Sequence, residues 1–167
     1  KLLSVKRPAS GRPDICLVIA DGLSAPAIEN QAVEMIKHLL PDFEKHGYQC
    51  PAIYTVRQAR VAIGDEISDL LQADMLVLLV GERPGLSSPD SLGIYFTYKA
   101  RRGFHDAQRN CLSNIRPQGL SFAEASRRLM WLMTEAQKLN TSGVTLKDNS
   151  QASVSLAEKN GRNFLVE

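Results

Sequence analysis

The sequence has no apolar run approaching the roughly 20 residues that a membrane-spanning helix requires. It also has no large excess of one charge, because 20 Lys and Arg face 18 Asp and Glu, and a formal charge of +2 is too small to indicate nucleic-acid binding. Its three cysteines, Cys16, Cys50 and Cys111, show no CxxC spacing, which argues against a zinc knuckle and a disulfide framework. These absences favour an ordinary globular protein of a reducing cytoplasm, with no membrane and no nucleic acid among its partners.

Motifs for nucleotides and metals are missing too. Neither GxxxxGK[ST] nor GxGxxG occurs, so simple NTP or NAD binding is disfavoured. The histidines His38, His46 and His105 join no cluster with metal-ligand spacing, and we predict no metal site.

What the sequence does contain is an alternation of apolar runs with segments of helical period, which is typical of βαβ units. The pattern predicts an α/β, Rossmann-like three-layer domain with a mostly parallel sheet. We expect a lead-in over residues 1–13, the domain over 14–146 and a polar tail over 147–167. The predicted strands are residues 15–20, 52–56, 75–80, 93–98 and 111–115, and the predicted helices are 25–40, 65–72 and one beginning near 122.

Turn residues predict where the helices begin and end. Pro41 either breaks or kinks the first long helix, or begins a further turn or two that stop at Gly47. Ser121 and Glu124 have the spacing of a capping box, and Gly143 is expected to close the last helix.

Ligands of open parallel sheets bind beyond the carboxyl ends of the strands, so three loops are candidates for a site. In the first, residues 20–27, an ordinary turn with Ser24 as a helix cap is favoured over anion binding. In the second, residues 55–66, Arg57 and Arg60 have the character of a solvated surface. The third, residues 81–93, holds Glu82, which either pairs with Arg83 or accepts hydrogen bonds from ligand amides.

A basic stretch follows, made of Lys99, Arg101, Arg102, Arg109 and Arg116. It can contact a phosphate or an acidic partner, although a solvated face is the more frequent role of such a stretch. His105 and Cys111 lie within it, and they raise the alternative of a cysteine-dependent hydrolase.

Several segments together resemble the small subunit of ethanolamine ammonia-lyase, over about Asp14 to Asp148. These segments read DICLVIADGLSAPAI, VAIGDEI, LLVGERPGLSSPDSLGIYFTY, RNCLSNIRPQGLSFAEA and SGVTLKD. The resemblance implies an adenosylcobalamin-dependent enzyme that converts ethanolamine to acetaldehyde and ammonia. It also implies a hetero-oligomer with a TIM-barrel large subunit, in the bacterial cytoplasm or in an ethanolamine-utilisation microcompartment. Small subunits of this family carry a further N-terminal region, which this sequence is expected to lack.

Carried over residue by residue, the resemblance implies cofactor contacts at Val61, Glu82 and Cys111, and no catalytic residue in this chain. Glu82 would accept amide hydrogen bonds, Val61 would offer an apolar or backbone contact, and Cys111 a small packing surface. None of the three histidines lies in a DxHxxG motif, so the cofactor is expected to keep its own base. The alternative is a stand-alone Rossmann-like module that binds a ligand or regulates another protein.

Overall fold

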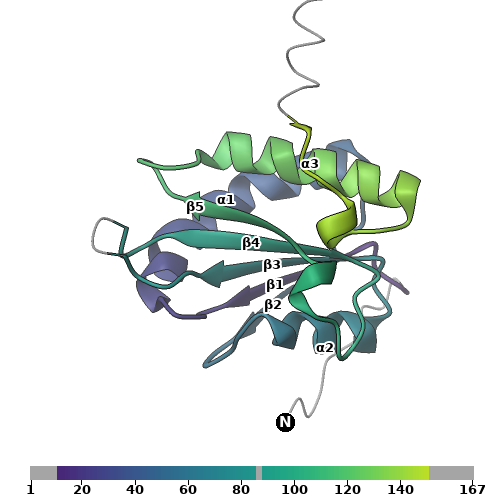
Figure 1. The fold of residues 1–167 in the computed structure, drawn as a ribbon, viewed down its shortest axis with the longest axis horizontal. Helices are drawn as coiled ribbons and strands as arrows, with labels where there is room; N and C mark the ends of the chain where they lie inside the picture. Colours follow the sequence, from purple (N-terminus) through teal and green to yellow (C-terminus); the bar gives the residue numbers. More distant parts are fainter. Residues whose placement is uncertain (1–10, 86–87, 151–167) are drawn as a thin grey trace, which may run out of the picture.

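A computed structural model describes residues 11–85 and 88–150 (Figure 1). Each predicted strand and helix is present. The strands are β1 (Ile15–Ala20), β2 (Ile53–Val56), β3 (Met75–Gly81), β4 (Leu92–Tyr98) and β5 (Asn110–Ile115), and the helices are α1 (Ala25–Lys45), α2 (Ala62–Leu71) and α3 (Phe122–Leu139). Two short 3-10 turns are η1 (Asp106–Gln108) and η2 (Gly143–Thr145). No helix in this part of the chain is long and apolar enough to cross a membrane.

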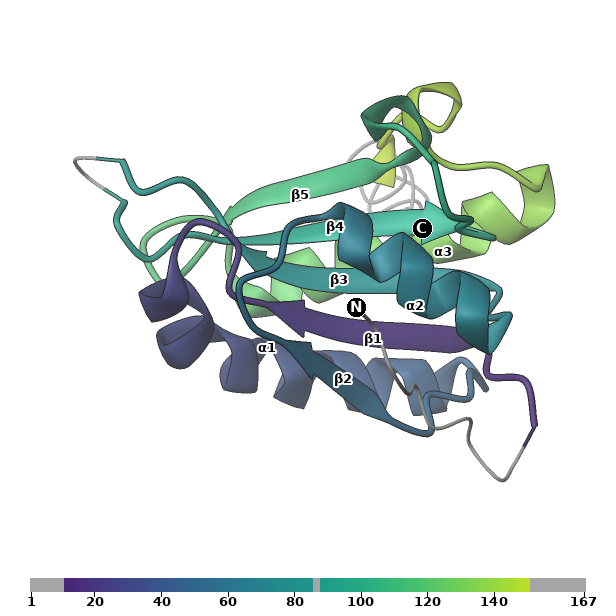
Figure 2. The same ribbon diagram turned by 90° about the horizontal axis from the view of Figure 1, so that it is seen from below.

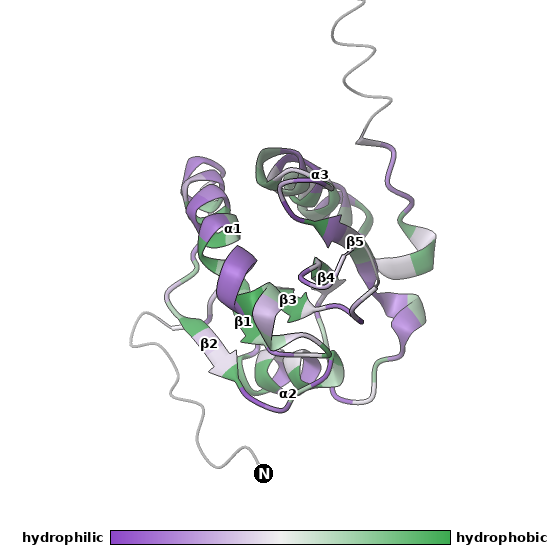
Figure 3. Cartoon of the chain, turned by 90° about the vertical axis from the view of Figure 1, so that its left-hand side faces the viewer, coloured by the Kyte–Doolittle hydropathy of each residue, from purple (hydrophilic) through white to green (hydrophobic). Residues whose placement is uncertain are grey.

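The elements form three layers around one five-stranded sheet with the order β2-β1-β3-β4-β5. Helices α1 and α3 cover one face and pack on each other, whereas α2 alone lies on the other face (Figure 1). Figure 3 shows β1 and β3, coloured as hydrophobic, between the pair α1–α3 and α2. The α/β three-layer part of the prediction is therefore correct.

The expectation of a mostly parallel sheet is wrong, because the sheet is mixed. Strand β1 pairs in parallel with β2 and with β3, but β3–β4 and β4–β5 are antiparallel. A parallel return needs a crossover of a dozen or more residues, usually a helix. Among the residues that the structure describes between β3 and β4 there is no helix, and only η1 lies between β4 and β5. The chain therefore turns back on itself after β3, and the βαβ alternation stops there.

The continuous apolar runs of the central strands are explained by burial on both faces. Successive side chains of a strand point to opposite faces, so Ile15 and Leu17 join the cluster under α1 and α3, while Cys16 and Val18 join the cluster under α2. All seven residues of β3 are buried.

Each of the three helices has a boundary that differs from the first expectation, and α2 begins three residues early, at Ala62. Helix α1 continues through Pro41 to Lys45 and stops before Gly47, which has a φ of 75°, so the second alternative for Pro41 is confirmed. Leu39 and Phe43 on either side of Pro41 are both buried in the core. Helix α3 ends at Leu139, with Asn140 in the left-handed conformation at φ 52°, and Gly143 does not close it. Gly143 instead lets the chain approach η1, since a Cβ there would lie 2.0 Å from the Ala107 carbonyl oxygen.

The loop after β1 lies against the end of β3 at two glycines. The Leu23 amide donates to the Gly81 carbonyl over 2.9 Å. A Cβ on Gly81 would lie 2.1 Å from the Ser24 carbonyl oxygen, and a Cβ on Gly22 would lie 2.3 Å from the Gly81 oxygen. Only residues without side chains permit this backbone contact.

We expect Gly81→Ala to lower the free energy of unfolding by roughly 3 kcal/mol or more, because the new methyl meets backbone atoms that cannot move aside cheaply. Gly85→Ala is the matched control, since a Cβ there meets nothing within 4 Å. Urea unfolding measures both variants. Equal stability losses at the two glycines would contradict the proposed contact.

Candidate functional site

Hydrogen bonds join the loops that follow β1 and β2. The Asp21 carboxylate accepts the backbone N–H groups of Gln58 over 2.7 Å and of Ala59 over 3.0 Å. In the opposite direction, the Arg60 guanidinium donates to the Gly22 carbonyl. Together with the contact between Gly22 and Gly81, these bonds bring the loops after all three parallel strands to one place.

Asp21 and Ser24 have structural roles in this convergence. The bonds from the amides of Ala59 and Gln58 hold the pKa of Asp21 below its ordinary value. Ser24 caps α1 by accepting the Ala27 amide over 3.3 Å, and its hydroxyl donates to the Pro89 carbonyl over 2.9 Å. The preference for Ser24 as an ordinary cap is confirmed.

A cavity of about 410 Å³ lies beside the joined loops. We call it the Glu82 cavity, and its walls come from the loop after β1, the start of α2, the end of β3 and the middle of β4. It is lined by Gly22, Leu23, Arg60, Val61, Val80, Gly81, Glu82, Arg83 and Tyr95. Val61 and Glu82, two of the three residues singled out from the sequence, thus face the same space.

The Glu82 carboxylate is held by neutral groups. Its Oε2 accepts hydrogen bonds from the Ser91 hydroxyl and from the backbone N–H of Asn114, the latter over 3.1 Å. Within the described residues it forms no ion pair with Arg83, so the alternative of neutralisation by that neighbour is not supported. The other oxygen, Oε1, lies over Gly93, where a Cβ would come within 3.0 Å of it. Gly93 therefore leaves room for a half-buried carboxylate that still has acceptor capacity.

Cys111 adjoins this cavity through Tyr95. The two residues are direct cross-strand partners in β4 and β5, and their side chains are close enough for each to shift the pKa of the other. Burial, the adjacent Cys111 and the charge of Glu82 raise the pKa of Tyr95 to about 12, so its hydroxyl keeps its proton at neutral pH. Cys111 itself is exposed.

The Cys111 thiol has properties opposite to those of a nucleophile. Although the residue as a whole is exposed, desolvation of its thiol by neighbouring side chains raises its pKa, whereas an activated cysteine needs a lowered one. Its partners are Ser113, with 3.3 Å between Sγ and Oγ, and Tyr95, rather than His105. The cysteine-hydrolase alternative therefore has no geometric support.

Only Val61 and Glu82 of the nine lining residues are expected as contacts from the sequence, and Tyr95 and Arg60 are two of those that the sequence does not reveal. Tyr95 lies inside a strand, where an aromatic residue is ordinary, and nothing in its neighbourhood along the chain marks its alignment with Cys111. Arg60 is exposed, as expected for a solvated surface residue, but it also lines the cavity and bonds the loop after β1.

The basic stretch is neither one phosphate site nor a simple solvated face. Three of its arginines each pair with a carboxylate of α2: Arg109 with Asp65, Arg102 with Glu66 over 3.5 Å, and Arg101 with Asp69 over 3.6 Å. This row of pairs ties the segment between β4 and β5 to the helix that begins beside Val61.

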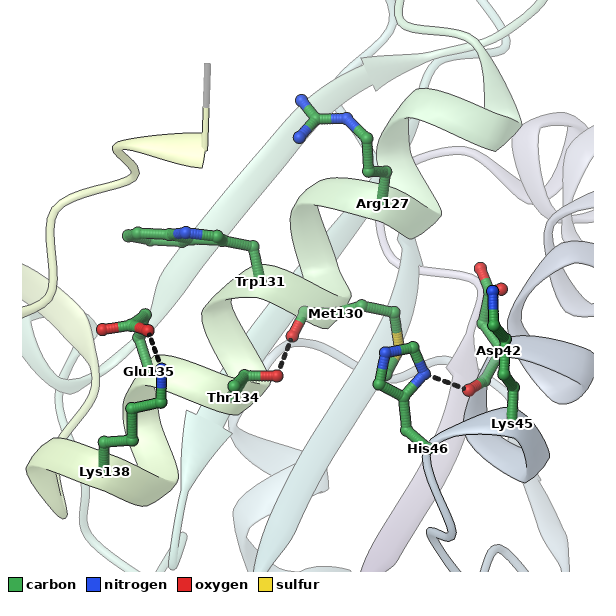
Figure 4. A pocket seen from close by; sticks show the side chains of 9 residues that line it. All are labelled: Asp42, Lys45, His46, Arg127, Met130, Trp131, Thr134, Glu135 and Lys138. Atoms are coloured by element: carbon green, nitrogen blue, oxygen red, sulfur yellow. Dashed lines mark hydrogen bonds and ion pairs between the residues drawn. The ribbon is translucent and has the colours of Figure 1, made fainter. Parts of the chain in front are cut away.

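A second hollow, of about 550 Å³, lies between the end of α1 and α3 (Figure 4). Most of its charged side chains are already committed within the chain, as in the pairs Glu135–Lys138 and Arg127–Glu124. His46 contacts the Asp42 carbonyl, and His38 stacks on Phe122. Among the residues that the structure describes, no three His, Cys, Asp or Glu side chains gather as a metal site requires.

The fold and the cavity define an α/β domain with a candidate ligand site at the carboxyl ends of its parallel strands. The family described as "Ethanolamine ammonia-lyase light chain (EutC)" matches residues 1–147. The chain belongs to this family.

Curated relatives agree with that assignment. The ethanolamine ammonia-lyase small subunit of Ralstonia nicotianae is 50% identical over 94% of this chain and 57% of its own length. Those of Pseudomonas syringae pv. tomato and Azotobacter vinelandii are 52% and 49% identical, over 84% and 93% of this chain and 49% and 58% of their own lengths. The chain thus spans about half to three fifths of the curated relatives that it matches.

The lowered pKa of Asp21 predicts a pH-dependent link between the first two loops. A carboxyl group whose pKa is lower when folded than when unfolded stabilises the fold above the unfolded pKa, and this contribution disappears as the pH falls through the folded pKa. We expect Asp21→Asn to cost about 1 kcal/mol at pH 7, an amount kept small because the site is partly solvated. The difference in melting temperature between wild type and variant should shrink in acid below pH about 4. A difference that stays constant with pH would contradict this role.

Proposed function

We propose that this chain is the α/β part of an ethanolamine ammonia-lyase small subunit, and that the Glu82 cavity with Cys111 beside it forms part of an adenosylcobalamin site. The reaction would be the conversion of ethanolamine to acetaldehyde and ammonia, completed with a TIM-barrel large subunit. The observation that carries this proposal is the shared cavity of Val61 and Glu82, in a chain that belongs to this family.

The chemistry of the cavity wall fits a corrinoid. Such a cofactor presents peripheral amides, a phosphate and a broad apolar ring, which call for acceptors, donors and apolar contacts side by side. The free acceptor capacity of Glu82 suits an amide N–H, and the guanidinium of Arg60 suits an amide or phosphate oxygen. Leu23, Val61 and Val80 supply the apolar part of the wall.

Each residue has a binding role in this proposal and none acts as a catalytic acid or base. When bound, the cofactor supplies the radical chemistry. Glu82 orients an edge of the corrin through its amides, while Ser91 and the Asn114 amide fix the carboxylate. Tyr95 offers a protonated hydroxyl and a ring face, and Cys111 offers a small neutral thiol. None of the described residues that line the Glu82 cavity is a histidine, which suits a cofactor that keeps its own base.

The size of the cavity favours a shared site. Pockets for drug-sized ligands occupy roughly 300–1,000 Å³ and bury most of the ligand, and a cobalamin is much larger than such a ligand. A cavity of about 410 Å³ holds only one edge of it. Figure 2 shows α2 over β1 and β3, with β4 and β5 running beside it. In this proposal the remainder of the cofactor would lie along β4 and β5. The large subunit would enclose the opposite side of the ring.

Reconstitution tests the subunit role. We expect no ethanolamine deamination from this chain alone, and activity when a cognate large subunit and adenosylcobalamin are added, because the chain contributes a wall of the site and no catalytic group. Acetaldehyde formation is the measurement. Large-subunit activity that is the same with and without this chain would contradict the proposal and favour a stand-alone module.

Replacement of Glu82 tests the cofactor contact. We expect Glu82→Ala to weaken cobalamin binding to the assembled complex by roughly 10-fold to 100-fold, the value of one or two charge-assisted hydrogen bonds. Folding should be largely retained, because removal of the carboxylate leaves space through which water can reach the Ser91 hydroxyl and the Asn114 backbone N–H. Absorbance titration with cobalamin measures affinity, and urea unfolding measures stability.

Glu34→Ala on α1 is the matched control for this experiment. Glu34 is also a half-exposed glutamate, but it pairs only with Lys37 on the helix surface. An unfolded Glu82→Ala chain, or equal affinities for the two variants, would argue against a cofactor contact at Glu82.

A further inference from the structure

The pair Arg109–Asp65 differs from the rest of the row that joins α2 to the segment between β4 and β5. Its two side chains are only 3% and 2% exposed, whereas those of Arg102 and Glu66 are 65% and 41% exposed. Exposed pairs contribute little to structure, because water and salt screen them and long side chains lose entropy. Arg109–Asp65 is therefore the only pair of this row that can hold the two segments in a fixed relation.

Arg109 holds three groups at once. Its guanidinium donates to the Asp65 carboxylate, to the Phe104 carbonyl over 2.9 Å and to Asp106 over 2.9 Å. Asp106 is 94% exposed, so its bond adds little to the orientation of Arg109. The Phe104 carbonyl and the Asp65 carboxylate fix the plane of the guanidinium. A lysine cannot reproduce this fork, because its ammonium is a point charge on a flexible stem.

The pair connects the two flanks of the candidate site. Asp65 lies in the first turn of α2, four residues after Val61. Arg109 directly precedes β5, two residues before Cys111. On its far side, the start of β5 is held by the Asn110 side chain, which bonds Gly143 and Leu146. A rotation of α2 relative to β5 would therefore require the Arg109–Asp65 pair to break.

Stability alone does not explain the pair. Asp65 Oδ1 and Arg109 Nε are buried without a hydrogen-bond partner in the described part of the chain. Buried ion pairs that are incompletely satisfied are often no better for stability than apolar side chains of similar volume, because desolvation offsets the attraction. Unlike an apolar pair, a buried ion pair constrains the direction in which its two side chains meet.

We propose that Arg109 and Asp65 are positioning residues that fix the distance between the start of α2, which carries Val61, and β5, which carries Cys111, and so set the shape of the corrinoid surface. The part of this inference that concerns cobalamin rests on the proposed function. The part that concerns the relation of α2 to β5 does not.

The test compares wild type with the apolar double variant Asp65→Leu/Arg109→Met and with Arg109→Lys, each assembled with the large subunit. We expect the double variant to keep the urea midpoint of the wild type, and to lose about tenfold in affinity for cobalamin in an absorbance titration. Without cofactor, amide hydrogen exchange in residues 60–66 and 109–113 should rise about tenfold, while β1 and β3 stay unchanged. Arg109→Lys should show the same changes in smaller measure.

The exposed pair gives the matched control, since Glu66→Gln/Arg102→Gln alters the same two segments and should change neither readout. Unchanged exchange in both Arg109 variants overturns the positioning role, whatever cobalamin does. If the double variant does not fold, Arg109→Lys decides, and unchanged exchange and affinity in that variant overturn the role. Faster exchange with unchanged affinity overturns the link to the corrinoid surface. A wild-type complex that binds no cobalamin contradicts the proposed function alone, because exchange still reports on the pair.

Discussion

The backbone contact between Gly22 and Gly81 is the constraint on which the candidate site depends. It brings the loop after β1 onto the end of β3 at a separation that no Cβ permits. Asp21 and Arg60, on either side of this contact, then attach the loop after β2 by bonds in opposite directions. These few bonds place the walls of the Glu82 cavity that come from the loops after the parallel strands. Most of the bonded atoms belong to the backbone. Apart from Arg60, which lines the cavity and also bonds Gly22, the side chains that these loops place in the wall can therefore serve a ligand without also holding the loops.

The other half of the site depends on the antiparallel return of the chain. Because β4 runs back beside β3, Tyr95 in the middle of β4 pairs with Leu78 of β3. Strand β5 then places Cys111 next to Tyr95. A further parallel βαβ unit would put a covering helix over this region. The mixed sheet, which the sequence did not predict, is thus what leaves room beside Glu82.

Some of these features follow from the sequence and others do not. The strands were predictable because a run such as Met75–Val80 has few conformations other than a buried strand, and Ser121 was recognisable as a cap. The direction of β4 was not, although the absence of a helical period between Gly81 and Gly93 was an available signal. Pairings across strands, such as Tyr95 with Cys111, and ion pairs over 44 positions, such as Asp65 with Arg109, depend on tertiary geometry that local patterns do not encode. Their roles toward a cofactor remain predictions.

The side chains of β5 that face the α2 side of the sheet have a consequence for assembly. Cys111 and Ser113 are exposed there, and both are small and weakly polar, while Leu112 and Ile115 turn inward to the core under α3. The hydrophobic core is therefore closed by this chain's own helices, and the surface left bare has little to drive aggregation. In the proposed complex with a large subunit, this face of β5 would meet its partner as a surface already formed by the folded chain, and assembly would be a docking of folded parts.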